Sequence, residues 1–215
     1  QMDIDRPTRI VKVRRDLNGD RSFEGFWGDK GEGFADQALA LSPIEKVWDS
    51  ISNEADWLVI GTIPLATKES SRSLLWTLEK AFLRGIRIAI DINWRPTFWD
   101  ETLNPLSGPS QETKDIIKPI LMKASLLKLA KEEAFYFFNT SDPFEISISL
   151  PNKPDVVVTD GGLPIRWCLS GLVGKTSIIS SVNVIDTTGA GDAFTAGLLY
   201  KLDAVGASSE SLNVM

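Results

Sequence analysis

The sequence has 215 residues, of which 43% are hydrophobic, and it carries a formal net charge of −6 at pH 7. This length predicts one domain with a full hydrophobic core. The acidic balance argues against nucleic-acid binding, which needs lysine and arginine to neutralise phosphates. No apolar run approaches the roughly 20 residues of a membrane-spanning helix. The single cysteine, Cys168, excludes an internal disulfide, and the lack of histidine rules out chemistry through imidazole.

In chain order, the first predicted element is a β-hairpin. Residues 8–15 and 21–27 are two extended runs, and Asn18-Gly19 between them is a strong turn signal. Short apolar runs then predict strands, and apolar residues at helical spacing predict helices. The predicted strands span residues 57–60, 86–90, 125–129, 156–159 and 165–169. The predicted helices span about 42–53, capped by Ser42, then 69–84, 110–123 with Pro119 as a point of bending or ending, and 131–138.

Strands that alternate with helices predict a mainly parallel sheet with helices on both faces. In such sheets, ligands bind at the carboxyl ends of the strands. The polar groups that follow Ile60, Ile90, Leu129 and Val158 are therefore the first candidates for a functional site.

The most informative segment is residues 186–194, which read Asp-Thr-Thr-Gly-Ala-Gly-Asp-Ala-Phe. Its glycines permit a tight turn, and apolar residues from Phe194 to Leu202 then recur at helical spacing. A turn at a helix start directs backbone N–H groups and the positive end of the helix dipole at one point, which attracts phosphate or a developing oxyanion. Asp192, in the first turn, is placed to remove a proton from a substrate hydroxyl. The alternative is an ordinary helix start with Asp192 as a first-turn charge.

A second group of polar residues, Asp91, Asn93 and Arg95, follows a predicted buried strand. At a spacing of two, an extended segment would project all three side chains to one side. A carboxylate, an amide and a guanidinium together suit a polyhydroxylated or phosphorylated ligand. The alternative is a surface turn held by an internal Asp–Arg pair.

Residues 186–194, followed by Ala196-Gly197-Leu198, resemble the C-terminal signature of the ribokinase-like (PfkB) carbohydrate kinases. The resemblance implies a three-layer α/β sandwich of the ribokinase type and an ATP-dependent transfer to a sugar. It implies that Asp192 is the catalytic base, and that the backbone at Gly189, Ala190 and Gly191 forms an anion hole for the transferred phosphoryl group.

The same resemblance assigns further positions. Asp91-x-Asn93-x-Arg95 is similar to a motif near the sugar and phosphoryl path of fructokinase-like members. Glu133 matches a glutamate that organises Mg²⁺ through water, although Ala130 stands where the family often has asparagine. Mg²⁺ keeps most of its waters, so one outer glutamate is chemically reasonable. The alternative is a solvated first-turn glutamate.

The expected nucleotide contacts lie at the ends of two neighbouring strands. Thr159 and Gly161 resemble the family's turn that meets the nucleotide, although Pro164 stands where a further glycine is common. An ordinary strand-ending turn is the alternative. Lys128, at the end of the preceding strand, is a further candidate for contact with the nucleotide.

We therefore expect a kinase that phosphorylates a hydroxyl of a sugar or sugar acid, with a fructose-like acceptor, ATP as co-substrate and Mg²⁺. A nucleoside acceptor fits the same motifs. The rival hypothesis is a non-catalytic fructokinase-like protein that acts as an interaction or regulatory module. The expected partners are small molecules rather than nucleic acid or membrane, and a homodimer is open for the full-length protein.

Relative to the family, an N-terminal third and a C-terminal segment are expected to be missing. Residues 1–205 would then be a partial kinase domain that is poorly active alone, and residues 206–215 a flexible tail. We expect an intracellular location, with cytoplasm and plastid both open.

Overall fold

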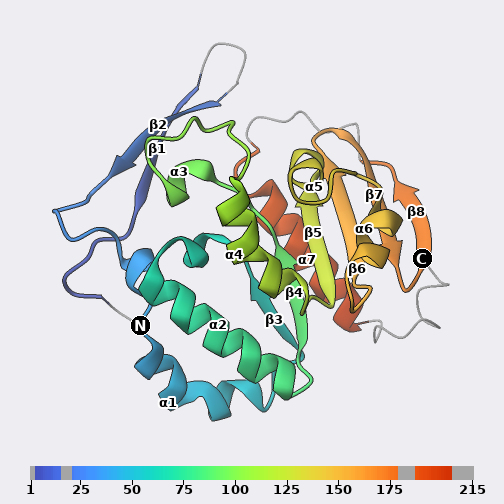
Figure 1. Cartoon of the computed structure of the whole chain (residues 1–215), viewed down its shortest axis with the longest axis horizontal. Coiled ribbons are helices and arrows are strands. Elements are labelled where there is room, and N and C mark those ends of the chain that lie inside the picture. Colours follow the sequence, from blue (N-terminus) through green and yellow to red (C-terminus); the bar gives the residue numbers. More distant parts are fainter. Residues whose placement is uncertain (1–2, 16–20, 179–186, 205–215) are drawn as a thin grey trace.

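The computed structural model describes residues 3–15, 21–178 and 187–204. Strands β1 (Ile10–Arg15) and β2 (Arg21–Trp27) form an antiparallel hairpin that projects from one end of the molecule (Figure 1). This confirms the predicted hairpin. Its turn at residues 16–20, Asp186 and the predicted tail at 206–215 lie outside the described residues.

The other strands of the described residues form one six-stranded sheet in the order β3-β4-β5-β6-β7-β8. Their bounds are β3 Trp57–Ile60, β4 Arg87–Asp91, β5 Leu126–Ala130, β6 Asp155–Asp160, β7 Leu163–Leu169 and β8 Leu172–Thr176. Strands β3 to β6 run parallel, whereas β7 and β8 pair antiparallel. The predicted mainly parallel sheet is therefore confirmed.

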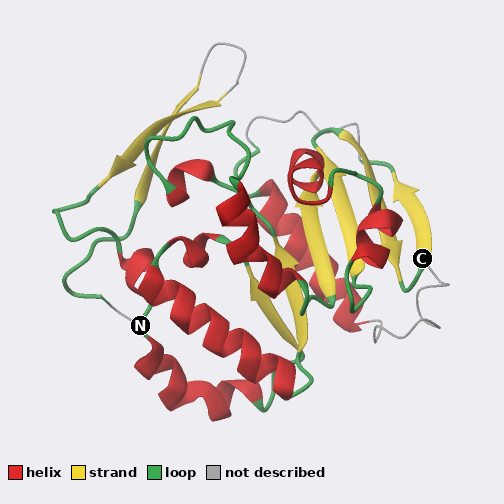
Figure 2. Cartoon of the chain, viewed as in Figure 1, coloured by secondary structure: helices red, strands yellow, loops and turns green. Residues whose placement is uncertain are grey.

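Helices cover both faces of this sheet. The α-helices are α1 Leu41–Ser52, α2 Lys68–Leu83, α3 Pro96–Trp99, α4 Gln111–Leu121, α5 Lys131–Phe138, α6 Pro143–Ser149 and α7 Ala190–Ala204. Two short 3₁₀ helices, η1 Ala35–Ala38 and η2 Ile63–Ala66, lie between them. Figure 2 shows α2, α4, α5 and α6 on the near face and α7 behind the strands.

Two apolar clusters correspond to these two faces. On the first, Ile90 of β4 belongs to the cluster that contains Leu78 of α2 and Ile120 of α4. On the second, Ala89 of the same strand packs in a cluster with Leu202 of α7. Successive strand residues point to opposite faces, so the three apolar residues at the centre of β4, Ile88, Ala89 and Ile90, bury both sides of the sheet. This arrangement confirms the predicted three layers.

The element boundaries differ from the predictions in a few places. Helix α1 begins at Leu41 after Ala40, and no side chain caps it, so the predicted cap by Ser42 is wrong. Pro43 is tolerated in the first turn because an N–H at that position would have no partner inside the helix. Helix α4 passes through Pro119 and ends at Leu121.

The structure also contains α3, α6 and β8, which the sequence reasoning did not predict. Within the described ranges, no helix is both long enough and apolar enough to cross a bilayer.

Candidate functional site

The parallel strands bring their carboxyl ends to one edge of the sheet. Strand β4 ends at Asp91, β5 at Ala130 and β6 at Asp160. In the strand register, Asp91 lies opposite Lys128, and Ala130 lies opposite Thr159. Most of the predicted site residues therefore gather at this edge, as expected for ligand binding in α/β sheets.

The glycine-rich turn opens helix α7, as the sequence predicts. Gly189 has a φ of +74°, a conformation that glycine adopts without the cost that a side chain would bring. The Ala190 N–H donates to the Thr187 carbonyl at 3.1 Å, and the Ala193 N–H donates to the Gly189 carbonyl at 2.8 Å. The N–H of Ala190 is thus already bonded inside the turn, which limits what it offers to a bound anion.

A cavity of about 320 Å³ lies between the start of α7 and the ends of β3 and β4. Asp192 and Thr195 line it from α7, and Asp91 and Asn93 line it from the end of β4 and the loop that follows. The structure therefore brings the predicted base together with two of the three residues of the predicted acceptor motif. The Asp192 side chain is exposed.

A buried ion pair lies beside this cavity. Lys128 Nζ is 2.8 Å from Asp91 Oδ2, and the two side chains are 11% and 13% exposed. Thr195 Oγ1 is 3.0 Å from the same carboxylate oxygen. Asp91 Oδ1 is buried and has no hydrogen-bond partner within the described residues. Asp91 and Lys128, which the sequence reasoning assigned to different ligands, thus contact one another.

The loop after β4 differs from the prediction. Asn93 has a φ of +44°, so the segment is not extended, and the premise that Asp91, Asn93 and Arg95 project to one side is wrong. Arg95 is exposed, and its guanidinium donates to the Trp94 carbonyl at 2.9 Å. Arg95 is not among the residues that line the cavity with Asp91.

Glu133 is buried where the β4 loop meets the start of α5. Its Oε1 accepts the Trp94 N–H at 2.6 Å, and its Oε2 accepts the Ala130 N–H at 2.7 Å. Burial raises the pKa of Glu133, and the charge of Asp91 raises it further, whereas the two N–H bonds and Lys128 oppose the shift. Each carboxylate oxygen thus already holds a segment of the site in place.

The predicted nucleotide residues lie along the edge, at the end of β6. The Thr159 hydroxyl is 3.4 Å from the Leu129 carbonyl, and Gly161 is exposed with a φ of +52°. Between them, Asp160 forms an ion pair with Lys131 at 2.9 Å. Sequence reasoning missed this pair because it depends on which strand lies beside β6.

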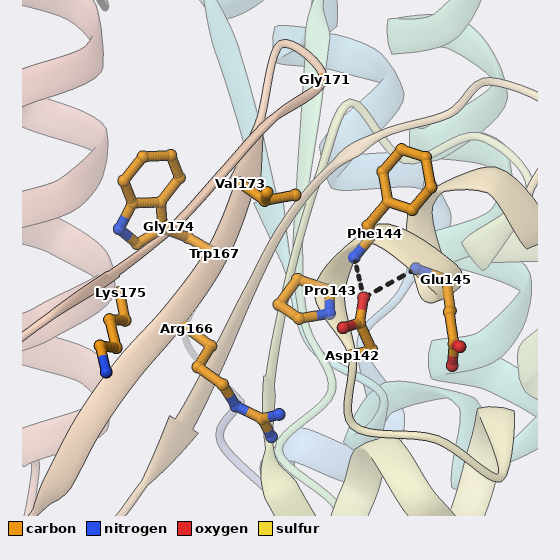
Figure 3. A pocket seen from close by; sticks show the side chains of 10 residues that line it. All are labelled: Asp142, Pro143, Phe144, Glu145, Arg166, Trp167, Gly171, Val173, Gly174 and Lys175. Carbon is orange, nitrogen blue, oxygen red and sulfur yellow. Dashed lines mark hydrogen bonds between the residues drawn. The ribbon is translucent and has the colours of Figure 1, made fainter.

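A larger cavity of about 630 Å³ lies between α6 and the β7–β8 hairpin (Figure 3). None of the predicted site residues lines it. The Asp142 carboxylate in its wall accepts the N–H groups of Phe144 and Glu145, and the Arg166 guanidinium donates to Ser141. These polar groups stabilise the start of α6 and its junction with β7. Size alone therefore does not make this cavity the candidate site.

Within the described residues, no group of three or more aspartate, glutamate or cysteine side chains could hold a metal ion. Mg²⁺, which the family resemblance implies, takes one or two carboxylates and completes its shell with water and phosphate oxygens. Glu133 fits such a role only through its remaining lone pairs, because both oxygens already accept backbone N–H groups.

Comparison with known proteins adds independent information. The model of the pfkB family carbohydrate kinases matches residues 5–213. The chain is 29% identical over 210 residues to a fructokinase of Klebsiella pneumoniae, with 96% of this chain and 62% of that protein covered. It is 27% identical to a fructokinase of Vibrio alginolyticus, with 92% and 59% covered. The chain thus spans about 60% of the length of these relatives.

Solved structures show the same fold. An uncharacterized sugar kinase from Pyrococcus horikoshii in complex with ATP aligns with a TM-score of 0.71 and 26% identity, over 93% of this chain and 58% of that one. A fructokinase from Xylella fastidiosa with bound ATP aligns with a TM-score of 0.70 and 22% identity, over 93% and 58%.

Proposed function

The chain belongs to the pfkB family of carbohydrate kinases, and on that premise we propose that it transfers the γ-phosphoryl group of ATP to a hydroxyl of a sugar or sugar acid. A fructose-like acceptor is favoured because both curated relatives described above are fructokinases. The ATP bound in the two structural neighbours supports the choice of co-substrate.

One observation carries the proposal: Asp192, at the glycine-rich start of α7, lines the same cavity as Asp91 and Asn93 at the end of β4. A general base, a turn of backbone N–H groups and polar groups for an acceptor are needed within a few ångströms in phosphoryl transfer. The cavity that Asp192 shares with Asp91 and Asn93 supports this arrangement.

In the proposed reaction, the carboxylate of Asp192 takes the proton of the acceptor hydroxyl, and the hydroxyl oxygen attacks the γ-phosphorus of ATP. The bond from this phosphorus to the β–γ bridging oxygen breaks, and ADP leaves with that oxygen. The N–H groups of Gly189 and Gly191 and the dipole of α7 stabilise the charge on the transferred group. Ala190 contributes only if its N–H is shared between Thr187 and a phosphoryl oxygen.

On the acceptor side, Asn93 offers an amide to hydroxyl groups from the cavity wall. Asp91 contributes only through Oδ1, because Oδ2 already contacts Lys128 and Thr195. Arg95 is exposed, and it reaches the acceptor or the transferred phosphoryl group only after its side chain leaves the Trp94 carbonyl.

On the nucleotide side, Thr159 and Gly161 are proposed to meet ATP at the end of β6. Glu133 would hold Mg²⁺ through water, and the ion would supply positive charge that neutralises the phosphates of ATP. Lys128 adds a positive charge behind the phosphoryl group rather than a direct bond to the nucleotide, because its ammonium is bound to Asp91.

The net charge of −6 argues against nucleic acid as a partner, and the proposed reaction needs only a sugar and ATP. An intracellular location and a homodimer of the full-length protein remain part of the proposal.

A coupled assay of ATP consumption by the full-length gene product tests this function. The panel contains fructose, other hexoses, a sugar acid and a nucleoside, each with and without Mg²⁺. We expect turnover with a sugar or sugar acid that needs Mg²⁺. If only the nucleoside is phosphorylated, the acceptor is a nucleoside and not a sugar or sugar acid. No turnover with any acceptor would favour a non-catalytic module, as the Ala130 substitution in the family pattern would allow.

A further inference from the structure

A buried network beneath the Gly-Ala-Gly turn connects α7 to the edge of the sheet, and we infer that Thr195 is the residue that positions this turn for phosphoryl transfer. Its hydroxyl connects the first turns of α7 to the Asp91–Lys128 ion pair. The inference rests on the proposed function and deepens it, because it gives a role to Thr195, a position within the signature segment to which the family resemblance assigns none.

The network follows from the strand register. Asp91 and Lys128 lie opposite one another on the parallel strands β4 and β5. Ala89 and Leu126, two residues earlier on these strands, belong to the apolar cluster on the α7 face. Side chains two apart on a strand point the same way, so Asp91 and Lys128 also face α7. Thr195 meets them from that helix, and it is itself only 7% exposed.

Thr195 is well placed to hold the turn because its hydroxyl reaches from the first turns of α7 to the edge of the sheet. Its hydroxyl is 3.0 Å from both Asp91 Oδ2 and the Gly191 carbonyl, and the ionised carboxylate is the stronger acceptor for its one hydrogen. The other polar contact between α7 and the sheet within the described residues joins Asp203 to Arg87 at the far end of the helix. Thr195 therefore joins the start of α7 to the edge of the sheet.

Gly191 shows how closely the turn approaches the ion pair. A Cβ atom added at this position would lie 3.2 Å from Lys128 Nζ, closer than ordinary van der Waals contact. The absence of a side chain lets the turn lie directly over the ammonium group. A positive charge held there, in a poorly solvated environment, acts on the phosphoryl oxygens that the turn would bind. Its effect depends on the turn keeping this position.

The test compares Thr195→Val, which keeps the shape but removes the hydroxyl, with Thr195→Ser, which keeps the hydroxyl. Thr77→Val is the matched control, because the Thr77 hydroxyl also bonds to the carbonyl four residues earlier in a helix but contacts no carboxylate. All variants are made in the full-length gene product. The kinetic readouts are kcat and the KM for ATP at equal folded fraction. The structural readout is hydrogen–deuterium exchange of the amides at residues 189–193.

Loss of a hydrogen bond to a charged group predicts that Thr195→Val lowers kcat about 10- to 100-fold. KM for ATP should stay within about threefold, because Thr195 lines the cavity proposed for the acceptor and is not one of the proposed nucleotide contacts. Exchange in the turn should quicken by roughly tenfold, since opening is then easier. Thr195→Ser and Thr77→Val should resemble the wild type in both readouts.

Wild-type kcat in Thr195→Val, or exchange in the turn no faster than in Thr195→Ser, overturns the inference. The inference is also overturned if lower stability of Thr195→Val accounts for all of its loss of activity, so that the activity per folded molecule is unchanged. If the wild-type protein phosphorylates no acceptor, the proposed function fails, and the exchange comparison alone decides whether Thr195 holds the turn.

Discussion

Replacement of Glu133 by glutamine separates the structural role of this carboxylate from its proposed role near magnesium. Glu133 is 7% exposed, and its two oxygens accept the N–H groups of Trp94 and Ala130 at 2.6 and 2.7 Å. It therefore joins the loop after β4 to the start of α5. Glutamine has nearly the same shape but only one acceptor oxygen, so one of the two N–H groups must face the amide nitrogen instead.

The expected cost follows from that lost bond. A buried N–H without an acceptor costs about 1–3 kcal/mol. Part of this is offset because a neutral side chain avoids the penalty for burying charge that raises the pKa of Glu133. We expect a net loss of about 1–2 kcal/mol in the free energy of unfolding, which corresponds to a fall of roughly 2–8 °C in Tm for a domain of this size.

Urea unfolding and calorimetry, with and without Mg²⁺, measure this effect. The control is Glu132→Gln, because Glu132 is the exposed neighbour in the same first turn of α5. It should change stability by less than about 0.5 kcal/mol. Equal effects of the two substitutions would refute the argument from the paired N–H bonds. A loss of stability that appears only with Mg²⁺ would also refute this argument, and it would point to a role of Glu133 in binding the metal.

Two further predictions concern pH and the turn. Burial raises the pKa of Glu133 above its usual 4.5, so as the pH rises through this value the folded state binds more of this proton than the unfolded state does. The stability advantage of wild type over Glu133→Gln in urea titrations should therefore shrink as the pH rises above 4.5, and an advantage that grows with pH would contradict this prediction. Gly189→Ala should cost about 1–2 kcal/mol because of its φ of +74°, whereas Gly191→Ala, at a helical position without positive φ, should not cost stability through backbone strain.

Much of the architecture could be predicted because apolar runs mark the buried strands and glycine or proline marks their ends. The bounds of β3 and α5 match the predicted 57–60 and 131–138. Helix α6 was missed because Phe144, Ile146 and Ile148 alternate with polar residues, a pattern typical of a strand. Its cap by Asp142, whose carboxylate accepts two N–H groups of the first turn, favours the helix instead.

The cavity was predicted better than its internal contacts. The segment that opens α7 and the polar residues after β4 identify the cavity, because both are local signals. The contact between Asp91 and Lys128 depends on the register of two strands, and the positive φ of Asn93 redirects the chain before Arg95. The sequence contains only a weak signal that Thr195 belongs to the site. It is a hydroxyl residue one turn after Asp192, in a helix whose inward side chains are otherwise apolar.

The most direct test of the account is the turnover of Asp192→Asn in the full-length gene product, with the preferred acceptor and saturating ATP and Mg²⁺. The substitution removes the proton acceptor but keeps the shape of a side chain that is already exposed. We predict that kcat falls by roughly 10²–10⁴, the usual contribution of a general base, while Tm stays within a few degrees of wild type. Wild-type turnover in this variant would contradict the proposal that Asp192 takes the proton of the acceptor hydroxyl.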